Sequence, residues 1–318
     1  MVRVSRFLTV VCIALLFTAG CSVPPDDQPG DPAAKATAET SASPFPDMQK
    51  VDGVALEARI PMAIASAQAR GADVDFALLD RQTGSFYSSN ADVQIETASV
   101  SKLFIADEVM FRAQTENRPV SVDELGTMTD MLEFSDDNAA YTLWYRYGTS
   151  DIVRAVAARY GLQRTTAPGD DQWYNTETTP SDLVGYYAGL LNGSGGLTTA
   201  STDVIIGMLR RSAPIAADGY KQHFGIVYGL PGESVHAVKQ GWMCCVTDRW
   251  VHLSTGTIGV ENRYILALSS REDIFYADDM ESYPDTAVVD VSDDASALHA
   301  RDTLTGFVSM LFPGGTVS

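Results

Sequence analysis

The stretch Val93-Gln94-Ile95-Glu96-Thr97-Ala98-Ser99-Val100-Ser101-Lys102-Leu103-Phe104-Ile105 passes from an extended segment into an apolar helix. Ser99 and Lys102 are three residues apart, so a helix that starts here places both side chains on one face, within reach of each other. A serine hydroxyl becomes a nucleophile once a base removes its proton. A lysine that is partly buried at the positive end of a helix can have a pKa low enough to be that base. We therefore expect Ser99 to attack a substrate and Lys102 to deprotonate it.

Two later segments contain residue types that suit the same chemistry. The first is Ser135-Asp136-Asp137-Asn138, between two helical patterns, and the second is Lys239-Gln240-Gly241-Trp242, at the end of a strand-like run. Each signal is weak by itself. About one Ser-x-x-Lys is expected by chance in a chain of this size, and Ser-Asp-Asp-Asn alone is typical of a helix cap. Their order along the chain makes the three together a stronger signal.

In this order the segments resemble the S-x-x-K, S-D-N and K-T-G motifs of the class A β-lactamase-like family of serine penicillin-recognising enzymes. The resemblance covers most of residues 50–315. It implies that Ser99 is the acylated serine and that Lys102 is its base. It also implies that Ser135 shuttles a proton and that Lys239 supports this shuttle and faces an anionic substrate. The implied activity is that of a serine acyl-enzyme hydrolase acting on a β-lactam or on a peptidoglycan-type peptide bond.

The chain departs from the family pattern inside these motifs. An ungapped alignment places Asp137 where the family has asparagine, whereas the alternative register 136–138 keeps the asparagine and loses the serine. Gln240 replaces the threonine of K-T-G and removes a hydroxyl that resembles a contact to the substrate carboxylate. Trp242 is bulky at the pocket edge, and its backbone amide and that of Ser99 fall at the family's oxyanion hole. The residues expected to line the substrate site are Asp137, Gln240, Gly241 and Trp242.

Deacylation in this family depends on a glutamate of an Ω-loop, and an asparagine a few positions later, that hold a water. No glutamate occurs in residues 134–176. Asp170 and Asp171, in a shortened loop at 168–175, are candidate substitutes, and Asp137 is a third. Because a shorter side chain on another backbone need not reach the water, we expect acylation at Ser99 followed by slow release.

The periodicity of the remaining chain predicts an α/β (α+β) protein with an antiparallel sheet flanked by helices. Helical spacing predicts a first helix at 54–70 and a last one at 298–312. A hairpin is expected at 72–90, and the later strands at 235–241, 249–258 and 262–270. The helices expected between them are 99–115, 121–133, 138–147, 149–160, 180–192 and 200–211. We therefore expect one sheet built from both chain ends, with an all-helical lobe at about 97–230 inserted.

The N-terminal residues have the pattern of an export signal. In residues 1–20, Arg3 and Arg6 precede a short apolar core. The core ends in Thr18-Ala19-Gly20-Cys21, which resembles a bacterial lipobox with threonine in place of the usual leucine. The resemblance implies that Cys21 is lipidated, with palmitate as one such acyl group, and that the protein is anchored at the extracytoplasmic face of the cell membrane. The alternative is an ordinary signal peptide whose cleavage site lies beside a cysteine.

Residues 21–48 are rich in Pro, Asp, Ala, Ser and Thr, so a disordered linker is expected before a domain at 49–318. The 22 basic and 41 acidic residues give a net charge of −19, which repels phosphate backbones. We therefore expect no nucleic-acid partner.

The histidines show no metal-ligand spacing, so neither a metal nor a cofactor is expected. For adjacent Cys244 and Cys245, a vicinal disulfide and two buried thiols are the alternatives.

Two functions remain compatible with the sequence. The first is the acyl-enzyme hydrolase, which the retained serine and lysines favour. The second is a degenerate, non-catalytic lipoprotein of the same fold with a binding or envelope-organising role, which the replaced motif positions favour. The oligomeric state is not determined by the sequence.

Overall fold

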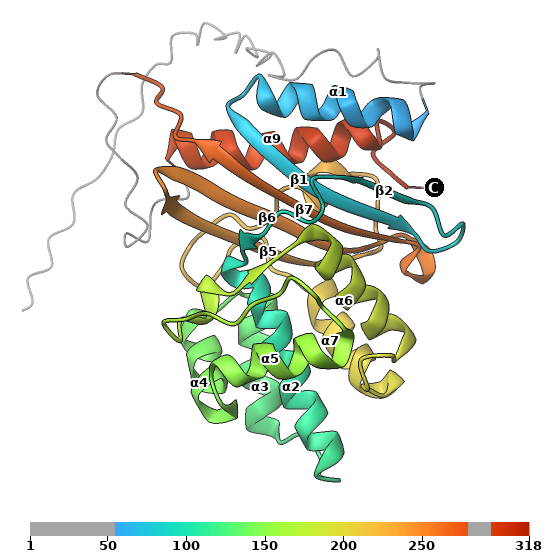
Figure 1. Ribbon diagram of the computed structural model, residues 1–318, viewed down its shortest axis with the longest axis vertical. Coiled ribbons are helices and arrows are strands. Elements are labelled where there is room, and N and C mark those ends of the chain that lie inside the picture. Colours follow the sequence, from blue (N-terminus) through green and yellow to red (C-terminus); the bar gives the residue numbers. More distant parts are fainter. Residues whose placement is uncertain (1–54, 279–293, 318) are drawn as a thin grey trace, which may run out of the picture. The chain divides into compact units, whose positions relative to one another are not determined.

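A five-stranded antiparallel sheet has the strand order β2-β1-β7-β6-β5 (Figure 1). The computed structural model describes residues 55–278 and 294–317. The strands of this sheet are β1 (Ala72–Asp80), β2 (Phe86–Ser89), β5 (His236–Val246), β6 (Arg249–Ile258) and β7 (Tyr264–Asp273). Strand β1 pairs with β7 from Ala72 opposite Glu272 to Asp80 opposite Tyr264. Segments far apart in the chain therefore share one sheet, which confirms the predicted α/β (α+β) class.

Helices α1 (Leu56–Gln68) and α9 (Ala295–Leu311) lie side by side on one face of the sheet (Figure 1). Their apolar sides meet the alternate strand residues that point to this face, and the rings of Phe76 and Phe307 are 5.3 Å apart. The predicted terminal helices thus cover the sheet as expected. Helix α9 begins earlier than predicted because the Asp294 side chain accepts hydrogen bonds from the first backbone amides of the helix.

The helical lobe lies on the other face of the sheet (Figure 1). Its helices are α2 (Lys102–Thr115), α3 (Val122–Glu133), α4 (Asp137–Tyr147), α5 (Ser150–Tyr160), α6 (Pro180–Asn192) and α7 (Thr199–Arg210). Each corresponds to a predicted helix. A second core, which includes the fully buried Phe104 and Trp144, joins this lobe to the sheet.

The connections differ from the sequence expectation in three places. Residues 211–225 form a loop and not the continued helical lobe, and only the short α8 (Ile226–Gly229) follows. Strand β5 continues past residue 241, because it resumes pairing with β6 after an irregularity between Met243 and Val246. The pair β3 (Ile95–Glu96) and β4 (Glu177–Thr178), and the 3-10 helices η2 (Ala98–Ser101), η3 (Trp173–Asn175) and η4 (Val260–Asn262), were not predicted.

The predicted leader at 1–20 and the linker at 21–48 lie outside the described residues. Within the described ranges, no helix has the length and apolar character needed to cross a bilayer.

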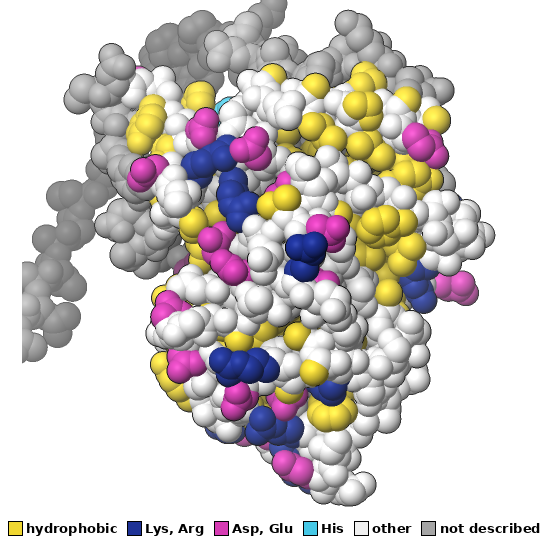
Figure 2. Space-filling model, viewed as in Figure 1, with side chains coloured by type: hydrophobic (Ala, Val, Ile, Leu, Met, Phe, Trp, Pro, Cys, Tyr) yellow, Lys and Arg dark blue, Asp and Glu magenta, His cyan; other side chains and the backbone are white. Residues whose placement is uncertain are grey.

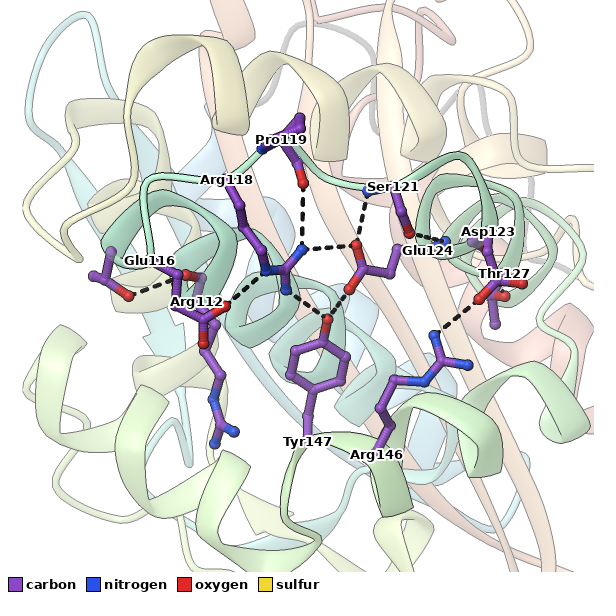
Figure 3. Close-up of polar contacts among 11 residues, drawn as sticks. Arg112, Glu116, Arg118, Pro119, Ser121, Asp123, Glu124, Thr127, Arg146 and Tyr147 are labelled. Atoms are coloured by element: carbon purple, nitrogen blue, oxygen red, sulfur yellow. Dashed lines mark hydrogen bonds and ion pairs between the residues drawn. The ribbon is translucent and has the colours of Figure 1, made fainter.

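A polar network fixes the distal end of α4 to the turn between α2 and α3 (Figure 3). Arg118 and the hydroxyl of Tyr147 both donate to the carboxylate of Glu124, which also closes a capping box with Ser121. Burial alone would raise the pKa of Glu124, but the hydrogen bonds from Tyr147, Ser121 and Arg118 lower it to about 2. The network holds α4 in place, and Asp137 lies at the other end of this helix.

The surface shown in Figure 2 carries basic and acidic side chains intermingled. On this face the Lys and Arg side chains stand in small separate groups, mostly beside Asp or Glu. Such a face offers no continuous basic surface to a phosphate backbone.

Strand β5 packs directly against η2 because Gly241 has no side chain. A Cβ at this position would lie 2.7 Å from the carbonyl oxygen of Thr97 and 3.2 Å from Val100. The glycine therefore sets the separation between the edge strand and the segment that carries Ser99.

We expect Gly241→Ala to destabilise the protein by roughly 1–3 kcal/mol, because the contact is with backbone that cannot rotate away. Gly126→Ala is the matched control. Gly126 lies exposed in α3 with no atom near its missing Cβ, so alanine should raise stability by about 0.5–1 kcal/mol. Urea unfolding of both variants measures the difference. Equal stability changes would show that β5 is free to shift away from η2.

Candidate active site

Ser99 lies in η2, immediately before α2, and only 6% of it is exposed. The backbone amide of Thr97 donates to the carbonyl of Thr176, which ties the start of this turn to the segment after η3. Ala98 has a φ of +44°, in the left-handed region that is unfavourable for residues other than glycine. The surrounding contacts hold this turn in a conformation that presents the Ser99 hydroxyl next to Lys102.

The four predicted catalytic side chains meet in one cluster. The Nζ atom of Lys102 lies 3.0 Å from Ser99 Oγ and 3.3 Å from Ser135 Oγ. From the sheet, Lys239 Nζ donates to Ser135 Oγ at 2.9 Å. Elements from the lobe and from the sheet edge thus bring Ser99, Lys102, Ser135 and Lys239 together, although 140 positions (239 − 99) separate the first from the last.

Burial determines the electrostatics of the two lysines. Burial lowers the pKa of Lys102, although the Asp137 carboxylate, and more weakly Asp218 and Asp136, oppose this change. Burial and the nearby Lys102 lower the pKa of Lys239 well below its usual value. A neutral amine is the form that can accept a proton from a serine hydroxyl, so burial shifts both lysines toward the form that a base requires.

The structure selects the ungapped register of the second motif. Ser135 has a φ of +55°, and its hydroxyl lies between the two lysine amines. Asp137 Oδ1 accepts from Lys102 Nζ at 2.6 Å. Asp136 caps α4 by accepting from the amide of Ala139, and Asn138 is exposed in the first turn of this helix. A carboxylate therefore stands at the position that the motif assigns to an amide.

The side chains of Gln240 and Trp242 do not join this cluster. Neighbouring residues of a strand point to opposite faces, so both lie across β5 from Lys239 and Gly241. The Gln240 amide is 1% exposed and donates to the carbonyl of Phe224 at 2.6 Å. The Trp242 ring stacks on Tyr220, with centroids 4.5 Å apart. Motif order alone did not specify on which face a replaced residue packs.

Neither aspartate of the predicted Ω-loop points at Ser99. The Asp170 carboxylate is exposed and bonded to Gln172 and Asn175 of its own loop. Asp171 accepts from the Ser150 hydroxyl at 2.6 Å. The loop carboxylates therefore serve local structure and leave the cluster without a nearby loop base.

Trp173 occupies the place beside Lys102. Its indole is 2% exposed, and Lys102 Nζ lies 4.7 Å from the ring centroid, within the range of a cation–π contact. Tyr141 packs edge-on against the same ring at 5.9 Å and donates to Gln172. None of the three motifs indicates this tryptophan. Its position next to the catalytic-type lysine depends on the packing of η3 against η2.

Asp218 is a second residue that the motifs did not indicate. It lies in a loop that runs along the end of α3, where the amide of Ala217 donates to Phe134 O at 2.7 Å and that of Ala213 to Glu133 O at 2.8 Å. This places the loop next to the Ser135 turn. The carboxylate of Asp218 raises the pKa of both buried lysines, against the effect of burial.

Cys244 and Cys245 are joined in a disulfide at the irregularity of β5, and Cys21 lies outside the described residues. Among residues 55–278 and 294–317, no group of three His, Cys, Asp or Glu side chains is arranged to hold a metal ion. Burial, with a smaller effect of Arg301, lowers the pKa of His252 to about 3, so this histidine is neutral.

Comparison with known proteins gives matches over most of the chain. The profile of the beta-lactamase enzyme family matches residues 55–248. LppW of Mycobacterium tuberculosis and of Mycobacterium bovis, named as a candidate lipoprotein, is 42% identical over 262 residues, which is 82% of this chain and 76% of that protein.

Solved structures with a similar fold have much lower identity. PBP-A is 18% identical with a TM-score of 0.59, covering 81% of this chain and 96% of that one. A mutant of PBP-A in an acyl-enzyme complex with penicillin G is 16% identical with a TM-score of 0.58, at the same coverage of 81% and 96%. A beta-lactamase from Sphaerobacter thermophilus is 14% identical with a TM-score of 0.57, covering 80% and 97%.

We expect Lys239→Met to raise the stability of the protein at neutral pH by more than the ~0.5 kcal/mol typical of neutral substitutions. The folded protein binds the Lys239 proton less tightly than the unfolded chain does, so its stability rises with pH toward the usual pKa of 10.5. Methionine does not titrate, so the variant lacks the rise of stability with pH that Lys239 causes. The gain should therefore shrink as the pH rises.

Denaturant unfolding at several pH values between 6 and about 10 tests this prediction. The exposed Lys221→Met is the control and should show no such trend. A Lys239→Met variant that is less stable at neutral pH would contradict the electrostatic account of the cluster.

Proposed function

The chain belongs to the beta-lactamase enzyme family, and from this premise we propose that it is a serine acyl-enzyme hydrolase with slow release of the acyl group. The proposed substrates are a β-lactam or a peptidoglycan-type peptide. The observation that carries the proposal is the contact of Lys102 Nζ with Ser99 Oγ at 3.0 Å in a site where burial lowers the lysine pKa.

Acylation follows from the contacts of the cluster. Ser99 Oγ attacks the substrate carbonyl carbon while its proton passes to the neutral amine of Lys102. The bond between the carbonyl carbon and the leaving nitrogen then breaks. Ser135 Oγ gives its proton to that nitrogen and regains one from Lys239 or Lys102, whose amines lie 2.9 and 3.3 Å away. Proton count is conserved, and the acyl group is left on Ser99.

Deacylation needs a second base that activates a water. Asp170 and Asp171 are bonded within or beside their own loop, and Asp137, the third candidate, is held in an ion pair with Lys102. The Trp173 ring, and not a carboxylate of the same loop, lies beside Lys102 and presents an apolar surface to it. Removing a positioned general base typically costs about 10²–10⁴-fold in rate. An acyl group on Ser99 should therefore persist. The acyl-enzyme solved for a mutant of PBP-A supports the chemical class of the adduct.

A binding or envelope-organising lipoprotein without turnover is the second candidate. The ion pair between Lys102 and Asp137 favours it, because a carboxylate 2.6 Å from the amine stabilises the protonated lysine, which cannot act as a base. The name of the LppW relative is compatible with either function.

We further propose that residues 1–20 are removed on export, that Cys21 carries the lipid anchor and that residues 21–48 tether the domain at 49–318 to the membrane. The lipoprotein name of a 42% identical relative supports anchoring. Metabolic labelling with an alkyne fatty acid should mark the wild type and not Cys21→Ser, which should be released into the medium. Equal labelling of both variants would refute the anchor.

The first functional prediction concerns acylation. Incubation with a fluorescent penicillin should add one acyl group to the wild type, seen by intact-mass analysis, and none to Ser99→Ala. Lys102→Met should slow the addition by about 10²–10⁴-fold, because the base is lost. Ser101→Ala, which removes a neighbouring hydroxyl bonded to the Ala98 carbonyl, should be labelled normally. If neither penicillin nor a neutral thioester acylates Ser99, the acyl-enzyme function is refuted and the non-catalytic function replaces it.

The second functional prediction concerns release. Trp173→Glu should shorten the lifetime of the Ser99 adduct at least about tenfold, because it places a carboxylate beside the acyl group. Trp173→Phe keeps the apolar wall and should leave the lifetime unchanged. Trp173→Ala with added acetate tests the same point if the glutamate is not accommodated, since a free carboxylate can enter the cavity. Rapid release by the wild type would contradict the role given to Trp173.

A further inference from the structure

We propose that the site around Ser99 selects acyl donors that carry an ammonium group next to the scissile carbonyl and discriminates against anionic donors. The inference rests on the proposed acyl-enzyme function and names its substrate class. It is carried by the position of Asp137 and by the orientation of Gln240.

A substrate that approaches the site from solvent meets the exposed carboxylate of Asp137 before it meets the buried lysines. The Asp137 side chain is 59% exposed, whereas the Lys102 side chain is fully buried and Lys239 is 1% exposed. Asp137 Oδ1 contacts Lys102 Nζ, and Oδ2 has no hydrogen-bond partner among the described residues. Lys102 Nζ also contacts Ser99 Oγ at 3.0 Å, so a single amine links the Asp137 carboxylate to the serine that would attack the carbonyl.

The charges around the cluster also favour a cation. Lys239 experiences the charges of Lys102, Asp137 and Asp218, and Lys102 experiences those of Asp137, Asp218 and Asp136. Three carboxylates therefore act on two lysines, and burial weakens the charge of both lysines. The net charge of −19 adds to this bias at longer range. The charges around Ser99 thus disfavour an anionic group.

The hydrogen-bonding groups of the site also favour a cationic substrate over an anionic one. A carboxylate only accepts hydrogen bonds, so Asp137 can bind an ammonium or amide N–H but cannot donate to a carbonyl or a carboxylate. The Gln240 amide, which could otherwise donate to an anionic substrate, is buried and bonded to Phe224 O. Asp137 and Gln240, which replace the asparagine and the threonine of the family motifs, therefore both disfavour an anionic donor. Asp137 in addition provides an acceptor for a cation.

Three thiobenzyl esters of D-alanine with one leaving group test the inference. The free amine is cationic, the N-acetyl derivative is neutral and the N-succinyl derivative is anionic. Ser99 Oγ displaces benzyl mercaptan, which takes up the serine proton, so acylation is followed by thiol release and by intact mass. For each donor, the acylation rate of the wild type is divided by that of Asp137→Asn, so the intrinsic reactivity of the donor cancels. A change in the reactivity of Lys102 caused by the substitution affects the ratios of all three donors alike.

Asp137→Asn should slow the cationic donor relative to the neutral one by roughly fivefold or more and speed the anionic donor by a similar factor. Asp218→Asn should give a smaller change in the same direction. Asp151→Asn removes an exposed carboxylate of α5 that does not belong to the Ser99 cluster. It should leave the relative rates of the three donors unchanged. Equal ratios in wild type and Asp137→Asn, or a wild-type preference for the anionic donor, would overturn the inference.

The binding of unreactive analogues separates this inference from the acyl-enzyme function. In Ser99→Ala, D-alaninamide should bind more tightly than N-succinyl-D-alaninamide, measured by calorimetry. If no donor acylates Ser99 but this preference is found, the proposed function fails and the selectivity stands. If acylation is found and the amides bind equally in Ser99→Ala, the selectivity is refuted and the function stands.

Discussion

The burial of two lysine amines around one serine hydroxyl is the constraint on which the rest of the site depends. An amine removed from water favours its neutral form, so Lys102 can be a base only if the lobe and the sheet close around it. That closure requires β5 to approach η2 without a side chain between them, which Gly241 provides. The same closure brings Lys239 within 2.9 Å of Ser135. The proposed chemistry thus depends on the packing of the edge strand.

Asp137 and Trp173 modify this arrangement in different ways. The carboxylate of Asp137 partly offsets the effect of burial on Lys102, and the indole of Trp173 closes the other side of the same amine. One places negative charge on the exposed side of the site, and the other presents an apolar ring to Lys102. On these two contacts rest the slow release and the preference for a cationic substrate that we propose.

The sheet and the helices of the lobe could be predicted because their signal is local. The apolar residues that alternate along a strand or recur at helical spacing are the residues that are buried. For this reason β1, β6, β7 and the lobe helices lie close to their expected bounds. Loops lack such a signal. The segment 211–225 was expected to be part of a helical lobe, yet it runs along Glu133 and Phe134 through backbone hydrogen bonds that no periodicity encodes. Asp218 reaches the cluster only through this path.

The fold class and the pairing of Ser99 with Lys102 could be predicted from spacing and residue chemistry, and the resemblance to three family motifs added Ser135 and Lys239. The neighbours that act on these four residues became apparent in the folded chain alone. Gln240 and Trp242 lie on the other face of β5. Asp170 and Asp171 form hydrogen bonds within or beside their own loop, and Trp173 packs against Lys102. The physical reason is that strand face, loop path and burial depend on contacts between residues far apart in the chain, which a linear motif does not contain.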